Sequence, residues 1–399
     1  MNYQKLDPTS AEALPSGMDL FSTPLTQVAI ERTYEREFLT MNPRSDTPYT
    51  FRILTGTGFM VPNRTRIVTS WVLRKKDWDA GANKFKTEDF VDVEAADKLV
   101  PINGLGATFI RDMKVQLQGQ LIFDANNLYS QYAYIENLMN FPEESKKSSM
   151  SSYGWYHEDT GKSAQFKDPP PDGWKKRRDL FLNGQEVEFS APLYADFFQQ
   201  PLFLLNNMHL EIVIQPQTAN YLVVAPEKYK GAVELELTQI KMYATFVDLH
   251  PGVALELEKK LEHEPARYFM NRITLRSQFV EPVRNEATFA AFTDYIPDEM
   301  TVFAMLKQNY QGQLDRDPTF LGHFDMRNFS VLAGNMEIPH VAFELDIEKG
   351  KYMRAYEHMH RTLGTFRSVF RSVFIRFEAS FSHFSPFLSY FLWIYKTFF

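Results

Sequence analysis

Four consecutive residues come closest to a catalytic motif, because Thr160, Gly161, Lys162 and Ser163 match the end of a phosphate-binding loop. In that loop, backbone amides of a glycine-rich turn surround the phosphates and the lysine contacts them. The motif requires a further glycine at the position that Tyr156 occupies. No phosphate cradle can form without that glycine, so we do not expect nucleotide binding here.

The close histidine pair, His358 and His360, is the best candidate for a metal site. Residues two positions apart on a helix point in different directions, so the two imidazoles could not easily share a metal ion. No carboxylate follows them within the next several residues. The chain also has no cysteine, which excludes thiolate zinc sites and disulfides. We therefore expect no metal, no cofactor and no enzymatic activity.

A basic run, Lys175, Lys176, Arg177 and Arg178, is a candidate contact with another macromolecule. Such a run can serve as a nuclear-import signal or bind the phosphates of a nucleic acid. It lies in a long polar stretch, residues 143–184, where a solvated run of charges is the usual outcome. The residues alone leave both interpretations open.

The overall composition favours a large β-rich protein. The chain has 399 residues, of which 44% are hydrophobic and 15% aromatic, enough for two domains with large cores. Aromatic side chains fit the pleated surface of a sheet. The net charge is −7 and Lys5 is the one basic residue among the first 30, so the start of the chain has no basic arm for nucleic acid.

The first 24 residues have neither the basic stretch nor the apolar stretch of a signal peptide. We therefore do not expect secretion by a signal peptide.

Alternating apolar residues predict short strands over most of the chain, for example at residues 66–73, 113–117 and 210–214. Gln118 and Gly119 predict the turn of a β-hairpin, and a change of phase within residues 233–246 predicts a β-bulge. Helical spacing is found at residues 127–141, with a shorter helix expected within residues 192–200. Residues 252–264, rich in Leu, Glu and Lys, are typical of a helical connector between two β domains.

The last segment, residues 365–399, differs from the rest because it is rich in Phe and Ser and poor in acids. Its most apolar part is interrupted by Pro386 and is shorter than the roughly 20 residues of a membrane-spanning helix. A tail anchor is one interpretation. A buried or aberrant C-terminus fits better, and we do not expect membrane insertion.

An ordered series of short matches resembles the major capsid proteins of Polinton (Maverick) elements and adintoviruses. The matches cover roughly residues 18–361. In the first half they are Asp19, Leu20, Phe21, Pro24, Thr26, Gln27, Ile30, Val100, Pro101, Ile102, Asn103, Val115, Gln116, Leu117, Gly119, Asn126, Asn127, Tyr129, Tyr132, Ala133, Tyr134, Ile135, Glu136, Leu138, Lys146, Lys147, Trp155, Tyr156, Asp196, Phe197, Phe198, Gln200, Leu204, Leu205 and Asn206. The second half matches more loosely, at Pro297, Gln311, Gly312, Pro318, Phe320, Phe324, Ile338, Pro339, Gly350, Tyr352, Arg354 and Tyr356.

The resemblance implies a mainly β fold, a tandem double jelly-roll of two β-sandwiches with a few short helices. It implies a homotrimer with a pseudo-hexameric outline, which tiles an icosahedral shell around double-stranded DNA. The expected location is then the virion capsid, and the host cell interior (nucleus or cytoplasm) during assembly. A minor capsid protein is an expected partner, and the genome is enclosed without sequence-specific binding.

The resemblance also suggests a division of the chain into an N-terminal arm (1–20), a first jelly roll (21–250), a connector (251–266), a second jelly roll (267–364) and an aberrant Phe-rich tail (365–399). The family's second jelly roll continues with more strands after Tyr356, whereas this chain runs into the tail. We therefore expect the second jelly roll to be truncated and incomplete.

A jelly-roll binding module without catalysis, similar to a lectin, is the alternative function. It predicts that Trp155 or Trp174, in the long polar stretch, stacks on a ligand.

Overall fold

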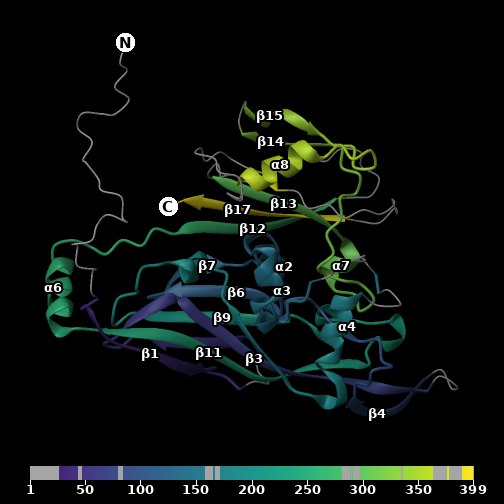
Figure 1. Ribbon diagram of the computed structural model, residues 1–399, viewed down its shortest axis with the longest axis horizontal. Helices are drawn as coiled ribbons and strands as arrows, with labels where there is room; N and C mark the ends of the chain where they lie inside the picture. Colours follow the sequence, from purple (N-terminus) through teal and green to yellow (C-terminus); the bar gives the residue numbers. More distant parts are fainter. Residues whose placement is uncertain are drawn as a thin grey trace, which may run out of the picture.

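The computed structural model describes residues 27–43, 47–79, 84–157, 165–166, 171–280, 288, 290, 297–333, 336–362, 375–376 and 389–398. In the described part the protein is mainly β, and its strands form a larger first half and a smaller second half (Figure 1).

The first half is a sandwich of two sheets. One sheet has the order β1-β11-β3-β4, with β8 also paired to β3, and the other has the order β2-β9-β6-β7. Their bounds are β1 (Ile30–Leu39), β2 (Tyr49–Leu54), β3 (Phe59–Asp79), β4 (Lys84–Asp92), β6 (Ile110–Leu117), β7 (Gln120–Asp124), β8 (Val187–Pro192), β9 (His209–Pro216) and β11 (Val233–Leu249). The short strands β5 (Val100–Pro101) and β10 (Val223–Val224) pair with each other beside these sheets.

The core between these two sheets follows the predicted alternation. In β9, Leu210, Ile212 and Ile214 are fully buried, while the residues between them are partly exposed. From the opposite sheet, Ile67 and Trp71 of β3 point into the same core. Two sheets that each bury one face in this way form a β-sandwich.

The predicted hairpin and bulge are both present. Strands β6 and β7 are joined by Gln118 and Gly119, which have φ values of 51° and 78°. A two-residue turn with positive φ at both positions matches the twist of the flanking strands, and glycine adopts it without strain. In β11 the register with β3 shifts between Leu237 and Gln239, at the predicted change of phase.

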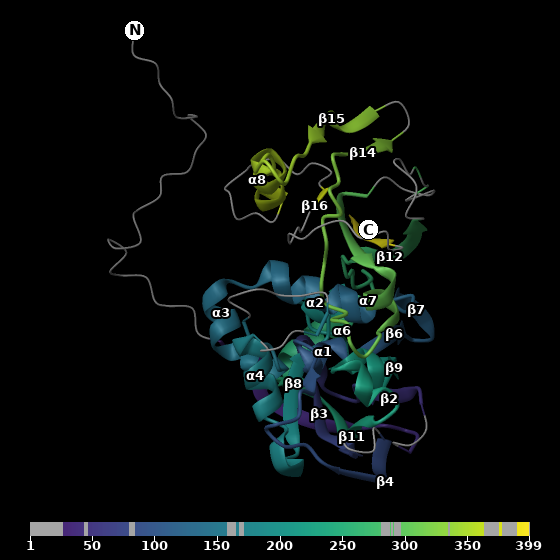
Figure 2. The same cartoon turned by 90° about the vertical axis from the view of Figure 1, so that its right-hand side faces the viewer.

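Short helices cover one side of the first half, as Figure 2 shows for α3 and α4. The predicted helix at residues 127–141 is α2 (Tyr129–Asn140), and the short helix expected at residues 192–200 is a 3₁₀ turn at Asp196–Gln199. The other helices are α1 (Leu105–Thr108), α3 (Glu143–Lys147), α4 (Asp172–Asp179) and α5 (Ala219–Leu222).

Two of these helices lie in residues 143–184, the long polar stretch for which the sequence predicted no helix. Helix α4 forms there because Trp174 is fully buried and packs against Phe166, with the two ring centroids 6.0 Å apart. One buried aromatic residue among polar residues gives no periodic pattern, so the sequence did not predict helix α4.

Helix α6 (Pro251–Leu261) lies between the last strand of the first half and the first strand of the second half, where we expected a helical connector. It sits at one end of the molecule, and β4 lies at the opposite end of the first half (Figure 1). Its exposed apolar side chain Leu255 and its Lys and Glu residues leave it without a buried face.

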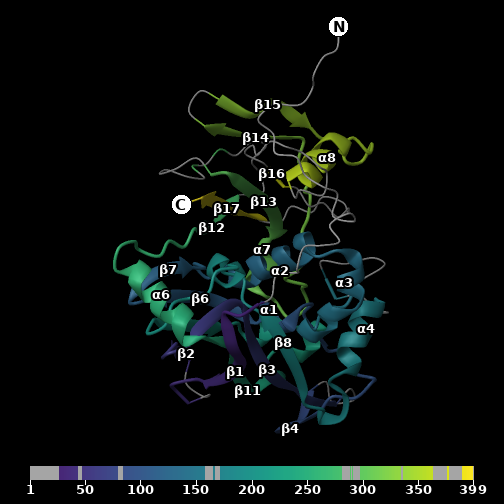
Figure 3. The same cartoon turned by 60° about the vertical axis from the view of Figure 1, so that its left-hand side comes forward.

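The second half contains a four-stranded sheet of order β12-β17-β13-β16 and a separate hairpin, β14-β15. The strands are β12 (Asn271–Val280), β13 (Glu299–Leu306), β14 (Asn328–Ala333), β15 (Met336–Glu344), β16 (Ile375–Arg376) and β17 (Ser389–Phe398). Helix α7 (Lys307–Gln311) follows β13 directly, and α8 (Met353–Thr362) packs beside the hairpin (Figure 3).

Strand β17 lies in the segment that we expected to be a buried or aberrant C-terminus. Its ten residues pair with β12 from Asn271↔Phe398 to Val280↔Ser389, and on the other side with all eight residues of β13. The tail therefore contributes a central strand to the second half. The Phe-rich composition and Pro386 concealed this, because the segment has no regular alternation of apolar and polar residues.

Candidate assembly unit

The sequence candidates for chemistry do not come together in the structure. Thr160, Gly161, Lys162 and Ser163 lie outside the described residues. His358 and His360 both lie on α8, but His358 packs against Phe343 and His360 against Tyr356. In the part of the chain that the structure describes, no group of three His, Asp or Glu residues could hold a metal ion.

The two tryptophans that a ligand-binding module would use are buried. Trp155 is 4% exposed and stacks on Tyr134 with 5.2 Å between ring centroids, and Trp174 is fully enclosed. Neither can stack on an external ligand, so the expectation of a lectin-like surface at these two residues is wrong. Their burial reflects the helices that fold residues 143–184 onto the sandwich.

The basic run is divided by its helix. On α4, Lys175 and Lys176 are exposed, whereas Arg177 is 3% exposed and its Nε donates to the Pro101 carbonyl oxygen at 2.9 Å. Arg178 pairs with the neighbouring Asp179. Arg177 thus holds α4 against β5, and the surface available to a partner consists of Lys175, Lys176 and Arg178.

The structure instead draws attention to the seam between the two halves. One hydrophobic cluster runs through both of them, so that Leu275 and Phe303 of the second half belong to the same buried set as α2 of the first. Exclusion of water from such a continuous surface stabilises one arrangement of the halves. The two halves therefore share one core.

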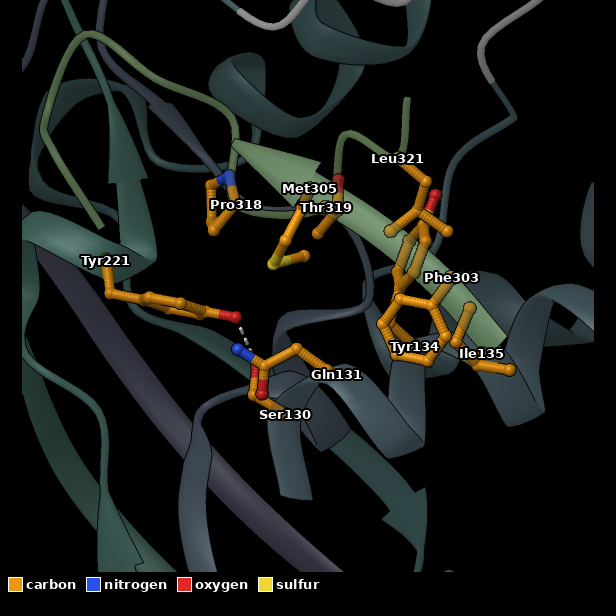
Figure 4. A pocket seen from close by; sticks show the side chains of 10 residues that line it. All are labelled: Ser130, Gln131, Tyr134, Ile135, Tyr221, Phe303, Met305, Pro318, Thr319 and Leu321. Carbon is orange, nitrogen blue, oxygen red and sulfur yellow. Dashed lines mark hydrogen bonds between the residues drawn. The ribbon is translucent and has the colours of Figure 1, made fainter. Parts of the chain in front are cut away.

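Figure 4 shows the centre of this seam, where α2 and Tyr221 face β13 and the loop after α7. A cavity of about 10 Å³ remains there, which is room for about one water molecule. Ser130 Oγ donates to the Tyr221 hydroxyl at 3.1 Å. Burial raises the pKa of Tyr221, so its hydroxyl stays neutral in this apolar setting.

Hydrogen bonds fix the seam at its α6 end. Both carboxylate oxygens of Asp196 accept from Asn271, one from its backbone N at 2.7 Å and one from its side chain at 3.1 Å. The Tyr268 hydroxyl donates to the Phe203 carbonyl oxygen at 2.9 Å and accepts from the Leu205 backbone N at 3.2 Å. Burial raises the pKa of Tyr268, which keeps the phenol protonated.

Further bonds fix the rest of the seam. Asn126 Nδ2 donates to the Leu275 carbonyl oxygen at 3.3 Å, and the Ala225 backbone N donates to the Leu314 carbonyl oxygen at 2.7 Å. The long polar stretch, residues 143–184, also bonds to the second half, because the Phe166 backbone N donates to the Asp315 carbonyl oxygen at 2.7 Å. These bonds connect distant parts of the chain, so their directions set how the halves are oriented.

Strand β1 forms one edge of the first half and is protected by charge. Arg32 pairs with Asp248 at 2.6 Å, and Glu37 accepts from the Tyr243 hydroxyl at 2.7 Å and pairs with Lys241 at 3.3 Å. The hydrogen bond from Tyr243 lowers the pKa of Glu37. Charged side chains on an edge strand oppose indiscriminate pairing with other chains.

No helix in the described part of the chain is long and apolar enough to cross a membrane.

Comparison with known proteins finds no matching family model. An uncharacterised protein of Caenorhabditis elegans is 24% identical over 278 residues, which cover 69% of this chain and 64% of the worm protein. The match thus spans less than two thirds of the length of that relative.

Solved structures resemble the chain over almost its whole length. The mavirus major capsid protein has a TM-score of 0.52 and 12% identity, over 99% of this chain and 90% of that chain. A chain from the Sputnik virophage structure has a TM-score of 0.55 and 9% identity, over 98% of this chain and 86% of that chain. The Faustovirus major capsid protein has a TM-score of 0.50 and 9% identity, over 78% and 69% of the two chains.

These neighbours are structural capsid proteins of large DNA viruses and virophages, not enzymes. The likeness extends through both halves and across the seam, so it concerns the tandem arrangement as well as the individual sandwiches. The chain therefore has the double jelly-roll fold of viral major capsid proteins.

Proposed function

We propose that this protein is a major capsid protein of the kind found in Polinton (Maverick) elements and adintoviruses. Three copies form a capsomer with a pseudo-hexameric outline, and the capsomers tile an icosahedral shell around double-stranded DNA. The observation that carries the proposal is the likeness to the mavirus major capsid protein over 99% of this chain.

The seam supports this function physically. A shell subunit must present fixed surfaces to its neighbours, since loosely hinged halves would pay an ordering cost at every contact. Here the shared hydrophobic cluster and the Asp196–Asn271 bonds give the two halves one orientation. The net charge of −7 suits a shell that encloses its genome without gripping it.

In this proposal, residues 21–250 form the first jelly roll, residues 251–266 the connector and residues 267–364 the second jelly roll, to which β17 adds a strand. A minor capsid protein is a further partner. The protein works in the virion and is assembled inside the host cell.

Assembly is the test of this proposal. The full chain is purified, its folding is checked by circular dichroism, and its mass is followed by light scattering behind a sizing column over a range of concentrations. We expect trimers, with capsomers or particles in negative-stain electron microscopy. A chain that is folded yet monomeric at the highest concentration would falsify the proposal.

A further inference from the structure

A buried lysine and a buried aspartate meet in the first half, away from the seam. Lys75 lies on β3, and Asp97 lies in the turn after β4. The Lys75 Nζ atom is 2.6 Å from Oδ1 of Asp97 and 2.6 Å from Oδ2. Both side chains are buried, with exposures of 10% and 8%.

The carboxyl carbon is within reach of the amine. Because Nζ is equally close to both oxygens, the Cγ atom bonded to them lies within about 3.5 Å of the amine nitrogen, and attack requires Nζ to approach Cγ from above the carboxylate plane. The neighbours Val93 and Leu99 are fully buried, so this pair is shielded from water. An amide formed here would be protected from hydrolysis for the same reason.

Two donors activate the carboxyl group as an acyl centre. The Tyr229 hydroxyl donates to Oδ1 at 3.0 Å, and the Glu94 backbone N donates to Oδ2 at 2.8 Å. Burial and the nearby Asp97 raise the pKa of Tyr229, so it keeps its proton. Fixed donors on both oxygens can stabilise the oxyanion of a tetrahedral intermediate, as in enzymes that transfer acyl groups.

We propose that Lys75 and Asp97 condense to an intramolecular isopeptide bond. A proton passes from the Lys75 ammonium to the carboxylate, which gives a neutral amine and a neutral acid. The amine nitrogen attacks Cγ, the C–O bond to one oxygen breaks, and this oxygen leaves as water with two of the three ammonium protons. The product is an amide, and no oxidant or reductant is involved.

The energetics of burial favour this product. Enclosing an ion pair requires both charges to be removed from water, and their attraction often does not repay that cost. The amide removes both charges, and its carbonyl oxygen can still accept from Tyr229. The bond would also join β3 to the turn after β4, a closure that no disulfide can supply because the chain has no cysteine.

The mass of the intact chain tests this proposal. Under denaturing conditions the purified full-length protein should be lighter than its sequence by one water, and proteolysis should yield a branched peptide that contains both Lys75 and Asp97. The matched control is Lys75→Arg, which keeps the ion pair but lacks the nucleophile, and which should have the full mass. Tyr229→Phe should form the bond more slowly, as a mixture of the two masses in freshly made protein.

A wild-type chain of full mass, with Lys75 and Asp97 in separate linear peptides, would show an ordinary ion pair and overturn the proposal. This outcome is decided on the wild-type protein, so it does not depend on whether a variant folds. It is also independent of whether the protein assembles into capsomers.

Discussion

At the scale of the residue, four adjacent basic side chains have two different fates. Arg177 is buried with its hydrogen bond to the Pro101 carbonyl oxygen, whereas Lys176 is exposed on the same helix. Position on the helix decides this, because successive residues point in directions about 100° apart. The run is therefore one buried structural residue, preceded by exposed residues and followed by the partly exposed Arg178.

Alanine at these two positions should separate stability from binding. Arg177→Ala removes a buried charge-assisted hydrogen bond and should lower the free energy of unfolding by about 2–3 kcal/mol. Lys176→Ala should stay within about 0.5 kcal/mol of wild type. Urea denaturation followed by tryptophan fluorescence measures both.

The same pair tests the nucleic-acid interpretation of the run. If the exposed residues contact phosphates, Lys176→Ala should weaken double-stranded DNA binding at low salt, in a filter-binding assay with folded protein. Equal DNA binding by wild type and Lys176→Ala would rule out a role for this lysine. Equal stability of Arg177→Ala and wild type would contradict the structural role of Arg177.

At the scale of the element, β17 is the strand on which the second half depends. It is hydrogen-bonded to β12 on one side and β13 on the other, so proline within it must remove a ladder bond from the middle of the sheet. We expect Ile394→Pro to lower stability by at least about 1–3 kcal/mol. The second half should become sensitive to limited proteolysis while the first half stays protected.

The matched control for this substitution is a proline on an edge strand. Glu31 lies at the irregularity of β1, where the register with β11 shifts between Ile30 and Arg32. Glu31→Pro should be tolerated, since edge strands and bulges accommodate proline. If Ile394→Pro is digested no faster than Glu31→Pro, β17 does not occupy the centre of the sheet.

At the scale of the whole molecule, the seam determines whether the chain unfolds as one unit. With one continuous core, calorimetry should show a single transition for the wild type. Asp196→Ala leaves the partly buried donors of Asn271 without their acceptor and should cost about 1.5–3 kcal/mol. We expect this change to split the transition, with the second half unfolding first.

An exposed aspartate is the control for the seam. The Asp172 side chain is 78% exposed and forms a surface pair with Lys175, so Asp172→Ala should keep the single transition and most of the stability. A single, unshifted transition for Asp196→Ala would mean that these hydrogen bonds do not couple the halves. If the protein forms the proposed trimer, trimer formation should also be weaker for Asp196→Ala than for Asp172→Ala, because the two halves of the altered chain no longer hold their contact surfaces in one orientation.

The sequence by itself determined the local features, because each depends on residues that are close along the chain. These include the alternation in β9, the turn at Gln118 and Gly119, the bulge in β11 and helix α2. The failure of the phosphate-loop motif is also local, since one missing glycine decides it. The candidate basic run was found in the same way, but only as a string of charges.

Only the tertiary structure decided which of these residues are available to a partner. Trp155, Trp174 and Arg177 lie in a mostly polar stretch of the sequence, yet tertiary packing buries them, and Arg177 bonds to Pro101 far away in the chain. The apolar tail residues become the central strand β17 because β12 and β13 leave a gap of one strand between them. Burial and pairing of this kind depend on contacts across the fold, and a single sequence carries no local signal for them.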